Sequence, residues 1–492
     1  MHNSYLNDVN YSGLNKEEYV QLLEIQQRKI QHLEFELKQL KRAIFGSKSE
    51  RFVGNSSNGH PGQLNLFEGE SKEPEPFEKI VVPEHEKRKQ KPKRKKLAEH
   101  LAREVEVIEP EADTAKMRCI GKQITEKLEA VPTTLFVREI QRLKYIDQQG
   151  KIHIAAMPNE PFPKSIAGPS FAAKIAVDKY IDHLPLYRQS KIYAREQIDL
   201  SRSTLNNIIA RGNRLLQPLY EAIKRNLLLQ QYLTADESSI RVLNKNTEKG
   251  SIKGCMLVMA SPTKKLVIFQ YIKTKEKANI LAALNGMEGH LQVDGNTSYE
   301  ELGKSPKITL LYCMAHGRRY FEKALEYDRQ KAEWALSCIK ALYQIERRIK
   351  ELSIAEKLKI RQEKSVPLLN KFKEWLEKHL ALNEPTNPIQ KAIRYFLKRW
   401  NGFIEYAHHG HLNIDNNLIE RQIRPLALGR KNYLFAGAHT GAHYAALYYS
   451  LFATCQLNGI EPFKWLNYVF SKIQEHPINR IDELIPHEGF TF

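Results

Sequence analysis

Cysteine is scarce in this chain of 492 residues, and its five cysteines never form a Cys-x-x-Cys pair. A disulfide framework and a four-cysteine zinc site both need cysteines in pairs. We therefore expect neither. Gly437 to Gly441 also lacks the Gly-Lys-Ser/Thr sequence of a P-loop, which argues against nucleotide binding of that kind.

Long apolar runs are missing as well. None approaches the roughly 20 residues that a membrane helix needs. The first residues after Met1 are polar, unlike the charged and then apolar pattern of a secretory signal. We expect a protein of the cytoplasm without membrane spans.

Acidic residues are outnumbered, with 57 Asp and Glu against 76 Lys and Arg, so the net charge is +19 and the pI is near 9.4. Such a charge favours a polyanionic partner, foremost nucleic acid, although ribosomal and membrane-surface proteins share it. The length predicts two to four domains. The sequence therefore indicates a modular protein that contacts nucleic acid.

The N-terminal region has the apolar spacing of a helical seam. Its members are Leu23, Ile30, Leu33, Leu37, Leu40 and Ile44. This spacing predicts a short coiled coil that ends at Gly46, or an amphipathic helix that packs on its own domain. The segment from Asn55 to Lys96 is rich in Gly, Pro, Glu and Lys and includes the basic run 87–96, which indicates a flexible linker that is either simply solvated or binds phosphates.

A helical pattern from Ala172 to about Lys224 is interrupted at 198–200, and Ser201 is a suitable N-cap for a helix over 203–216. A helix, a tight turn and a helix suggest a helix-turn-helix domain, although a plain helical pair has the same pattern. The residues on the second helix that would contact DNA are Arg202, Asn206, Asn207 and Arg211.

Five apolar runs rich in Val, Ile, Leu and aromatic residues predict strands over 227–235, 255–260, 266–271, 290–293 and 308–313. Helical segments are expected over 275–284 and 298–302. From Arg319 to His408 the pattern is helical, with breaks at Pro367, Pro385 and Pro388. Further helices are expected from Asn416, over 444–457 and over 462–473.

The order of these elements matches a ribonuclease H-like α/β core with a helical insertion, and it brings acidic residues to one edge of a sheet. Asp236 and Asp294 follow the first and fourth strands, which are neighbours in this topology, and Glu420 lies on the late helix. Carboxylates suit Mg²⁺ or Mn²⁺, and two such ions serve phosphodiester chemistry. An Asp after a strand is also a common turn residue, and Asp415, Glu237 and Glu301 are rival acids.

Basic residues surround the third acid. They are Arg421, Arg424, Arg430 and Lys431. The stretch 429–432 is interpreted as a basic turn that holds DNA phosphates, with an ion pair between Glu420 and Arg424 as the alternative. His408, His409 and His411 lie in a loop-like glycine context, where we do not expect a metal ion.

The stretch Asp415 to Gly437, DNNLIERQIRPLALGRKNYLFAG, resembles the C-terminal acid block of the insertion sequence 66 family of transposases, of the large TnpC type. Similar stretches are 45–51, 184–188, 235–237, 292–295 and 313–319, so the resemblance covers nearly the whole chain. It implies a DDE-type transposase of an insertion element, with the acidic triad Asp236, Asp294 and Glu420. It also implies a DNA-contacting His-x-Arg-Arg segment at His316, Arg318 and Arg319.

The chain departs from the family pattern at Ser238, where Thr is usual, and at Asn296, where an aromatic residue is usual. Between Leu101 and Tyr145 the family has a zinc-binding segment with paired cysteines, whereas this chain has only Cys119. We therefore expect the segment to fold without zinc.

The predicted organisation is a multidomain α+β protein. Its parts are a coiled-coil zipper (1–52), a basic linker (53–97), a degenerate zinc-segment-like domain (98–165), a helix-turn-helix-like domain (166–226), the first part of the core (227–322), the helical insertion (323–410), the closing helices with the third acid (411–457) and a helical tail (458–492). Expected partners are the terminal inverted repeats, target DNA, a second copy of the chain joined through the zipper, and small companion proteins of the same element; the expected location is the bacterial nucleoid. The alternatives are a DNA-binding regulator that no longer cuts, and a coiled-coil nucleic-acid scaffold.

Overall fold

The structure is a computed structural model that describes residues 160–163, 165–244, 246–381 and 387–492. It also describes positions 26, 27, 29, 30, 33, 34, 36, 37, 135, 137 and 138, and two short strands, β1 (Lys144–Ile146) and β2 (Ile152–Ile154). Residues 158–492 fall within one compact unit, and residues 49–157 form another. The finer division into eight segments stays a prediction.

The described positions between residues 26 and 37 are helical, and Ile30, Leu33 and Leu37 are exposed. A helix was expected here, and its pairing into a coiled coil stays a prediction. The other members of the seam, the basic linker and Cys119 lie outside the described residues. The segment compared with a zinc-binding domain contains β1 and β2, which pair antiparallel with Lys144 opposite Ile154.

Three helices precede the sheet: α2 (Pro169–Tyr180), α3 (Leu186–Arg195) and α4 (Arg202–Leu228). The Ser201 side chain accepts a hydrogen bond from the Thr204 amide, so the predicted N-cap of α4 is confirmed. The predicted strand start at 227 is wrong, because Leu219, Ile223 and Leu227 are all buried and continue one helical stripe. Recognition of DNA by α3 and α4 stays a prediction.

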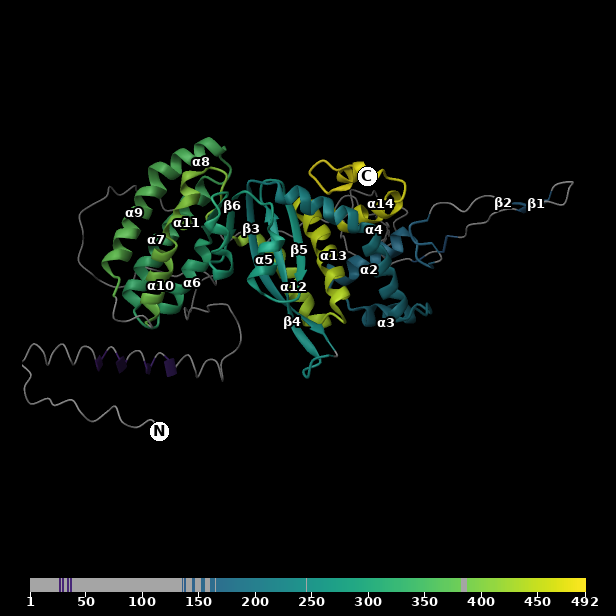
Figure 1. Cartoon of the computed structure of the whole chain (residues 1–492), viewed down its shortest axis with the longest axis horizontal. Coiled ribbons are helices and arrows are strands. Elements are labelled where there is room, and N and C mark those ends of the chain that lie inside the picture. The colour runs from purple at the N-terminus through teal and green to yellow at the C-terminus, as the bar shows by residue number, and fades with distance from the viewer. Residues whose placement is uncertain are drawn as a thin grey trace, which may run out of the picture. The chain divides into compact units, whose positions relative to one another are not determined.

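The sheet has five strands: β3 (Tyr232–Leu243), β4 (Ser251–Ser261), β5 (Leu266–Ile272), β6 (Gly289–Val293) and β7 (Ile308–Tyr312). Their order is β5-β4-β3-β6-β7, with antiparallel pairing among β3, β4 and β5 and parallel pairing of β3 with β6 and of β6 with β7. The connecting elements are α5 (Lys277–Ala283) and the 3₁₀ turns η2 (Thr297–Tyr299) and η3 (Leu302–Lys304). This mixed sheet is consistent with a ribonuclease H-like core (Figure 1).

The edge strand β5 is covered by the long apolar helix α13 (His439–Leu457). Ser450 and Thr454, one helical turn apart, accept hydrogen bonds from the backbone amides of Phe269 and Val267 through their hydroxyl groups. An edge strand would otherwise leave these amides unpaired. Among the described residues, no helix is long and apolar enough to cross a membrane.

The region after β7 is helical, as expected. It comprises α6 (Met314–Ala324), α7 (Arg329–Arg348), α8 (Ile354–Ile360), the π-helical turn η4 (Arg361–Ser365), α9 (Val366–Lys378), α10 (Pro388–Lys398), α11 (Trp400–Ile404) and the 3₁₀ turn η5 (Glu405–His408). Pro388 lies in the first turn of α10, where the missing amide costs nothing. The break expected at Pro367 is not found, because α8, η4 and α9 form one continuous helical run in which Pro367 is the second residue after the π-helical turn. Pro385 lies outside the described residues.

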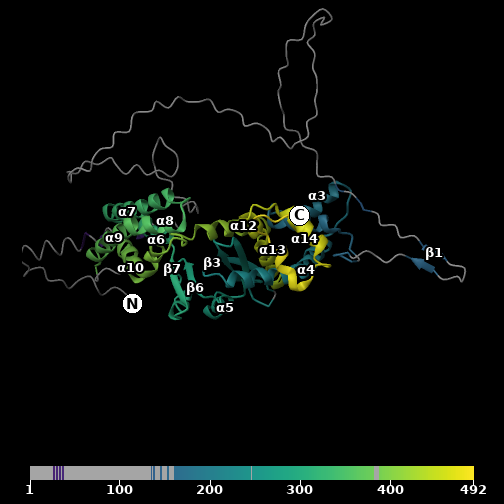
Figure 2. The ribbon, with the colours of Figure 1, turned by 90° about the horizontal axis from the view of Figure 1, so that it is seen from above.

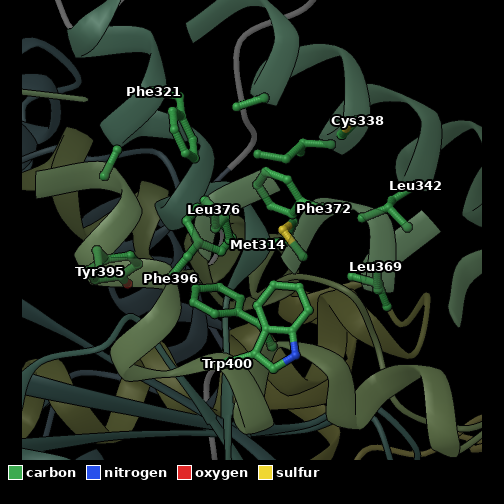
Figure 3. Close-up of a cluster of buried hydrophobic side chains, with 14 of the residues drawn as sticks. Met314, Phe321, Cys338, Leu342, Leu369, Phe372, Leu376, Tyr395, Phe396 and Trp400 are labelled. Atoms are coloured by element: carbon green, nitrogen blue, oxygen red, sulfur yellow. The ribbon is translucent and has the colours of Figure 1, made fainter. Parts of the chain in front are cut away.

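These insertion helices share an aromatic core that includes Phe321, Phe372, Phe396 and Trp400 (Figure 3). The core also takes in Leu311 of β7, and α11 packs on that strand. Figure 2 shows β6 and β7 on the side of the sheet next to the insertion helices. The insertion is therefore joined to the parallel part of the sheet.

The chain returns to the sheet through α12 (Asn417–Tyr433), which contacts β3 and β4. After α13, helix α14 (Pro462–Lys472) packs on α2, and the 3₁₀ segment η6 (Ile478–Leu484) contacts α4. Trp465 of α14 is completely buried and its indole N–H donates to the Leu484 carbonyl. The last helices thus close on the first ones.

Candidate active site

The pairing register of β3 and β6 brings two aspartates to the same level. The strands pair in parallel from Tyr232 to Thr234, with Thr234 opposite Gln292. Asp236 and Asp294 each follow two residues later, where β6 has ended. Asp236 was expected to end its strand. It does not, because β3 continues to pair with β4 as far as Leu243. The carboxylates therefore lie where the parallel ladder opens.

The turn after β6 is held by the insertion. An Asp294 carboxylate oxygen accepts the Asn296 amide at 2.8 Å, and Gly295 has a φ of 91°. Tyr395 donates its hydroxyl to the Asp294 carbonyl at 2.6 Å, and Arg399 donates to the Gly295 carbonyl at 2.9 Å. A Cβ at Gly295 would lie 2.5 Å from the Tyr395 hydroxyl. Only glycine fits this turn without displacing the tyrosine.

The start of α12 is anchored beside Asp236. Asn416 is fully buried, and its side-chain amide donates to the carbonyl of Ala235 at 3.0 Å. Its backbone amide contacts the sulfur of Cys313 at 3.2 Å. Glu420 follows one turn later, with its amide bonded to the Asn416 carbonyl. Asn416 therefore places the third acid near the residue that precedes the first.

The Glu420 carboxylate has its partners on α6. Arg319 donates to both oxygens at 2.8 and 2.9 Å, and Nε2 of His316 lies 3.7 Å from one of them. Among the described residues, Arg319 is the ion-pair partner of Glu420, so the alternative pairing with Arg424 is wrong. A guanidinium that reaches two oxygens from a neighbouring helix has better geometry than one on the same helix.

The three acids influence one another electrostatically. Burial raises the pKa of Asp236 to about 7, and the charges of Asp294, Glu420 and Glu237 add to the increase. A hydrogen bond from the Glu237 amide, at 2.6 Å, acts in the opposite direction. Asp236 is therefore about half protonated at neutral pH.

The ring of His316 lies next to Glu420 and is influenced by two of the acids. Burial and the charge of Arg319 lower its pKa, whereas the charges of Glu420 and Asp294 raise it. Its Nδ1 atom is buried without a hydrogen-bond partner in the structure. The ring is therefore a neutral neighbour of the acids near pH 7.

The rival acids each have a partner of their own. Asp415 accepts the backbone and side-chain amides of Asn417. Glu237 pairs with Lys275 at 3.1 Å. Glu301 pairs with Lys277 and Lys304. Asp415 thus has the contacts of a turn residue and Glu301 those of a surface residue. The Glu237 side chain is only 5% exposed, and it also accepts a hydrogen bond from the side-chain amide of Asn296 in the turn after β6.

The predicted DNA-contacting residues of the late helix differ in their surroundings. Arg421, Arg424 and Lys431 are exposed, whereas Arg430 donates to the carbonyl of Ser239 on β3. The interpretation of 429–432 as a turn is wrong, because α12 continues to Tyr433. Residues Tyr433 and Tyr449 pack closely over Gly429 and support the helix.

The other predicted DNA contacts lie on α4 and α6. Arg202 stands over the ring of Tyr187, and Arg211 donates to the Pro163 carbonyl. Asn206 is exposed and lines a cavity of about 330 Å³ beside the C-terminal end of α12. Arg318 pairs with Glu322 on its own helix at 2.8 Å. None of these contacts involves the three acids.

Sequence reasoning missed residues that act from a distance. Tyr395, Arg399 and Asn416 hold the acids in place, and no local pattern indicated them. It also missed a group formed by His290, Glu405 and His409, whose potential ligand atoms all lie within 4.8 Å of one another. His290 is too far along the chain from the other two for spacing to show this group.

A mixed five-stranded sheet with acidic side chains where its parallel strands separate is typical of proteins that process nucleic acids. Family models agree with this class: the model described as Transposase IS66 family matches residues 164–444, and the IS66 C-terminal element matches residues 450–487. A third model, described as Transposase C of IS166 homeodomain, matches residues 32–105. The chain belongs to the IS66 family of transposases, which act on DNA in the transposition of insertion elements.

Relatives from bacteria extend over most of the chain. The uncharacterized protein y4hP of Sinorhizobium fredii is 32% identical over 427 residues, which is 81% of this chain and 77% of the relative. The uncharacterized protein y4qI of the same organism is 30% identical over 473 residues, which is 92% of this chain and 87% of the relative. The similarity therefore includes the sheet, the insertion and the closing helices.

Proposed function

We propose that this chain is the DDE-type transposase of its insertion element, which cleaves DNA strands at the element ends and joins them to target DNA. Asp236, Asp294 and Glu420 would hold two Mg²⁺ or Mn²⁺ ions. The observation that carries the proposal is the parallel register of β3 and β6, which brings Asp236 and Asp294 to the same level where the ladder opens. Burial raises the pKa of Asp236 to about 7, and the charges of Asp294 and Glu420 add to this increase.

The residues fit hard divalent cations. All three donors are carboxylates, which are the ligands that Mg²⁺ prefers. The like charges that raise the pKa of Asp236 would be neutralised by bound cations. When bound, two such ions activate the attacking oxygen and stabilise the leaving oxygen of a phosphodiester. The protein contributes the fixed positions of the acids through Asn416, Tyr395 and Arg399.

Arg319 has a second role in this proposal. In the structure it neutralises Glu420. When Glu420 serves as a metal ligand, the guanidinium of Arg319 loses this partner and becomes available to a DNA phosphate. His316 remains beside Glu420 and limits the positions that the carboxylate can take.

DNA would lie along the exposed side of α12. Arg421, Arg424 and Lys431 extend from the acid site towards the end of that helix. Such phosphate contacts position DNA without reading its sequence. Arg202, Asn206 and Arg211 on α4 would recognise the terminal repeats. The N-terminal zipper would pair two chains, and companion proteins of the element would join the complex.

The proposal is tested by Mg²⁺-dependent or Mn²⁺-dependent nicking of DNA that carries the element's own ends, in the presence of its companion proteins. The variants Asp236→Asn, Asp294→Asn and Glu420→Gln should each lose at least about 100-fold in cleavage rate while retaining DNA binding. Glu301→Gln, a surface acid with lysine partners, is the matched control and should cleave normally.

The same experiment separates the alternatives. A natural chain that binds its ends but cuts in neither metal would be a DNA-binding regulator. A chain that binds DNA of any sequence equally and never cuts would be a nucleic-acid scaffold. Cleavage that survives all three substitutions would overturn the triad.

A further inference from the structure

Strand β6 has a second group of metal-binding side chains at its other end. His290 is the second residue of the strand, and Glu405 and His409 lie on and just after η5, at the exit of the insertion. Nε2 of His290 lies 3.4 Å from Oε1 of Glu405, and Nε2 of His409 lies 3.1 Å from the same oxygen. The ring centroids of His290 and His409 are 4.7 Å apart.

We propose that His290, Glu405 and His409 bind a divalent transition-metal ion of the Zn²⁺ type, with His411 as the fourth ligand. Zinc bonds of about 2.0–2.1 Å in a tetrahedron place neighbouring ligand atoms about 3.3 Å apart. The two distances to Glu405 already have this length. The ring centroid of His411 lies 6.0 Å from that of His290 and 5.7 Å from that of His409, so a rotation of its side chain can complete the set.

The donor atoms select the class of ion. Imidazole nitrogens with one carboxylate suit zinc and its neighbours, whereas Mg²⁺ prefers oxygen ligands alone. This group is therefore chemically distinct from the carboxylates of the active site.

The backbone of the group is fixed without any ion. The buried guanidinium of Arg361 donates to the carbonyls of Tyr406 and His409, and it forms an ion pair with Glu346 at 2.6 Å. Gln362 donates to the carbonyl of Ala407 at 2.8 Å. These bonds hold η5 in place, which reduces the cost of ordering ligands around a metal.

The opposite side of the group is equally fixed. The His290 amide donates to the Gln231 carbonyl at 2.8 Å, which fixes the backbone that carries this ring. Gly410 directly follows His409. A Cβ at Gly410 would collide with the carbonyl of Ile354, so the backbone after His409 is closely packed.

The position of the group indicates a structural role. Three residues separate His290 from Asp294 along β6. The segment after His409 leads to α12 and Glu420. A bound ion would tie the exit of the insertion to β6 and would restrict the segment that carries the third acid. It would not contact the reacting DNA.

The test uses full-length protein that has been stripped with a chelator and titrated with Co²⁺, which gives a visible absorption band at a tetrahedral site, followed by Zn²⁺ as competitor. The natural chain should show a band that Zn²⁺ removes, and its thermal midpoint should rise with Zn²⁺. His290→Gln and His409→Gln should weaken Co²⁺ binding at least about 100-fold. Glu405→Gln keeps a hydrogen-bond acceptor for the rings and should also weaken binding while remaining folded by circular dichroism.

Two controls separate this site from others. Asp294→Asn alters the active site and His487→Gln alters a surface histidine, and both should retain the band. If the natural chain gives no band, Glu405 is simply an acceptor for two imidazole N–H groups and the proposal fails. A band that persists in His290→Gln and His409→Gln belongs to cysteines or histidines elsewhere and also overturns it. Because the readout needs no DNA cleavage, its failure leaves the proposed transposase function untouched.

Discussion

The two ends of strand β6 carry groups of opposite electrostatic character. At the carboxyl end, the charges of Asp294 and Glu420 act on Asp236, and of these acids only Glu420 has an ion-pair partner in the described structure. At the amino end, His290 and His409 share one carboxylate in a set of short contacts. The carboxylates at the carboxyl end repel one another, whereas the histidines at the amino end have a carboxylate as partner. Position along a strand therefore does not decide what a site can bind; the donor atoms and their charges do.

The insertion contacts both ends but in different ways. At the carboxyl end it supplies hydrogen bonds from Tyr395 and Arg399 to backbone carbonyls of the turn, and no acid. At the amino end it supplies two of the side chains of the group, Glu405 and His409. Damage to either contact should therefore affect one end of β6 and leave the other intact.

Among the changes that compare the two ends of β6, the largest effect is expected for Arg399→Ala. Arg399 is 9% exposed, bonds to the Gly295 carbonyl and Glu300, and stacks on Tyr395. Its loss should lower the free energy of unfolding by about 2–4 kcal/mol and reduce cleavage more than tenfold. Urea unfolding and the nicking assay measure the two effects.

The two ends of β6 would not be independent if Arg399→Ala also abolished Co²⁺ binding at the amino end of the strand. Arg399→Lys is the matched control, because it keeps the charge without the planar fork and should recover only part of the stability. Equal behaviour of Ala and Lys would show that charge plays no part in holding the turn.

Asp236→Asn should raise the free energy of unfolding, by less than Arg399→Ala lowers it. The pKa of Asp236 in the folded protein, about 7, is higher than its ordinary value of 3.8. The folded state therefore binds the proton more tightly, and stability falls as pH rises between these values. At pH 8 with a chelator, the neutral Asn should increase the free energy of unfolding by about 1–3 kcal/mol.

This gain should be mostly lost at pH 4, where Asp236 is protonated in the folded protein and about 40% protonated in the unfolded one. Denaturant unfolding at the two pH values measures it. Glu301→Gln changes an acid that has lysine partners and should give no gain at pH 8. An Asp236→Asn variant that is less stable than the natural chain at pH 8 would show that the acid end is not repulsive.

The smallest expected effect is the pH dependence of cleavage. With a pKa of about 7, Asp236 is mostly ionised at pH 8 and mostly protonated at pH 6. At limiting Mg²⁺, the cleavage rate should fall about tenfold from pH 8 to pH 6, since a metal ligand must first lose its proton. Single-turnover nicking at saturating DNA measures it, and a flat profile would contradict the raised pKa.

Much of the sheet could be predicted from the sequence. The runs at 266–271 and 290–293 correspond to β5 and β6, each of which is one residue longer. These strands were predictable because Pro, Gly or charged residues lie on both sides of a short apolar run. The start of β3 was misplaced because the apolar residues that precede it suit a helix as well as a strand. Local patterns identified the elements and left their exact boundaries to tertiary packing.

The partners of the site residues could not be predicted in the same way. Arg319 and Glu420 are separated by about a hundred residues, as are Tyr395 and Asp294. Such pairs depend on how the insertion folds back on the sheet, which no local spacing encodes. The acids themselves were recognisable because each follows or lies within an element whose type the sequence indicates.

The insertion enters and leaves the core at one point. The Met314 amide donates to the Ile414 carbonyl at 3.1 Å, and the Asn416 amide contacts the Cys313 sulfur at 3.2 Å. A segment of about a hundred residues thus begins and ends at neighbouring backbone positions. Doubling the length of a closed loop costs only about 0.6 kcal/mol. The length of the insertion can therefore change at little entropic cost, provided that Tyr395 and Arg399 keep their bonds to the turn that carries Asp294.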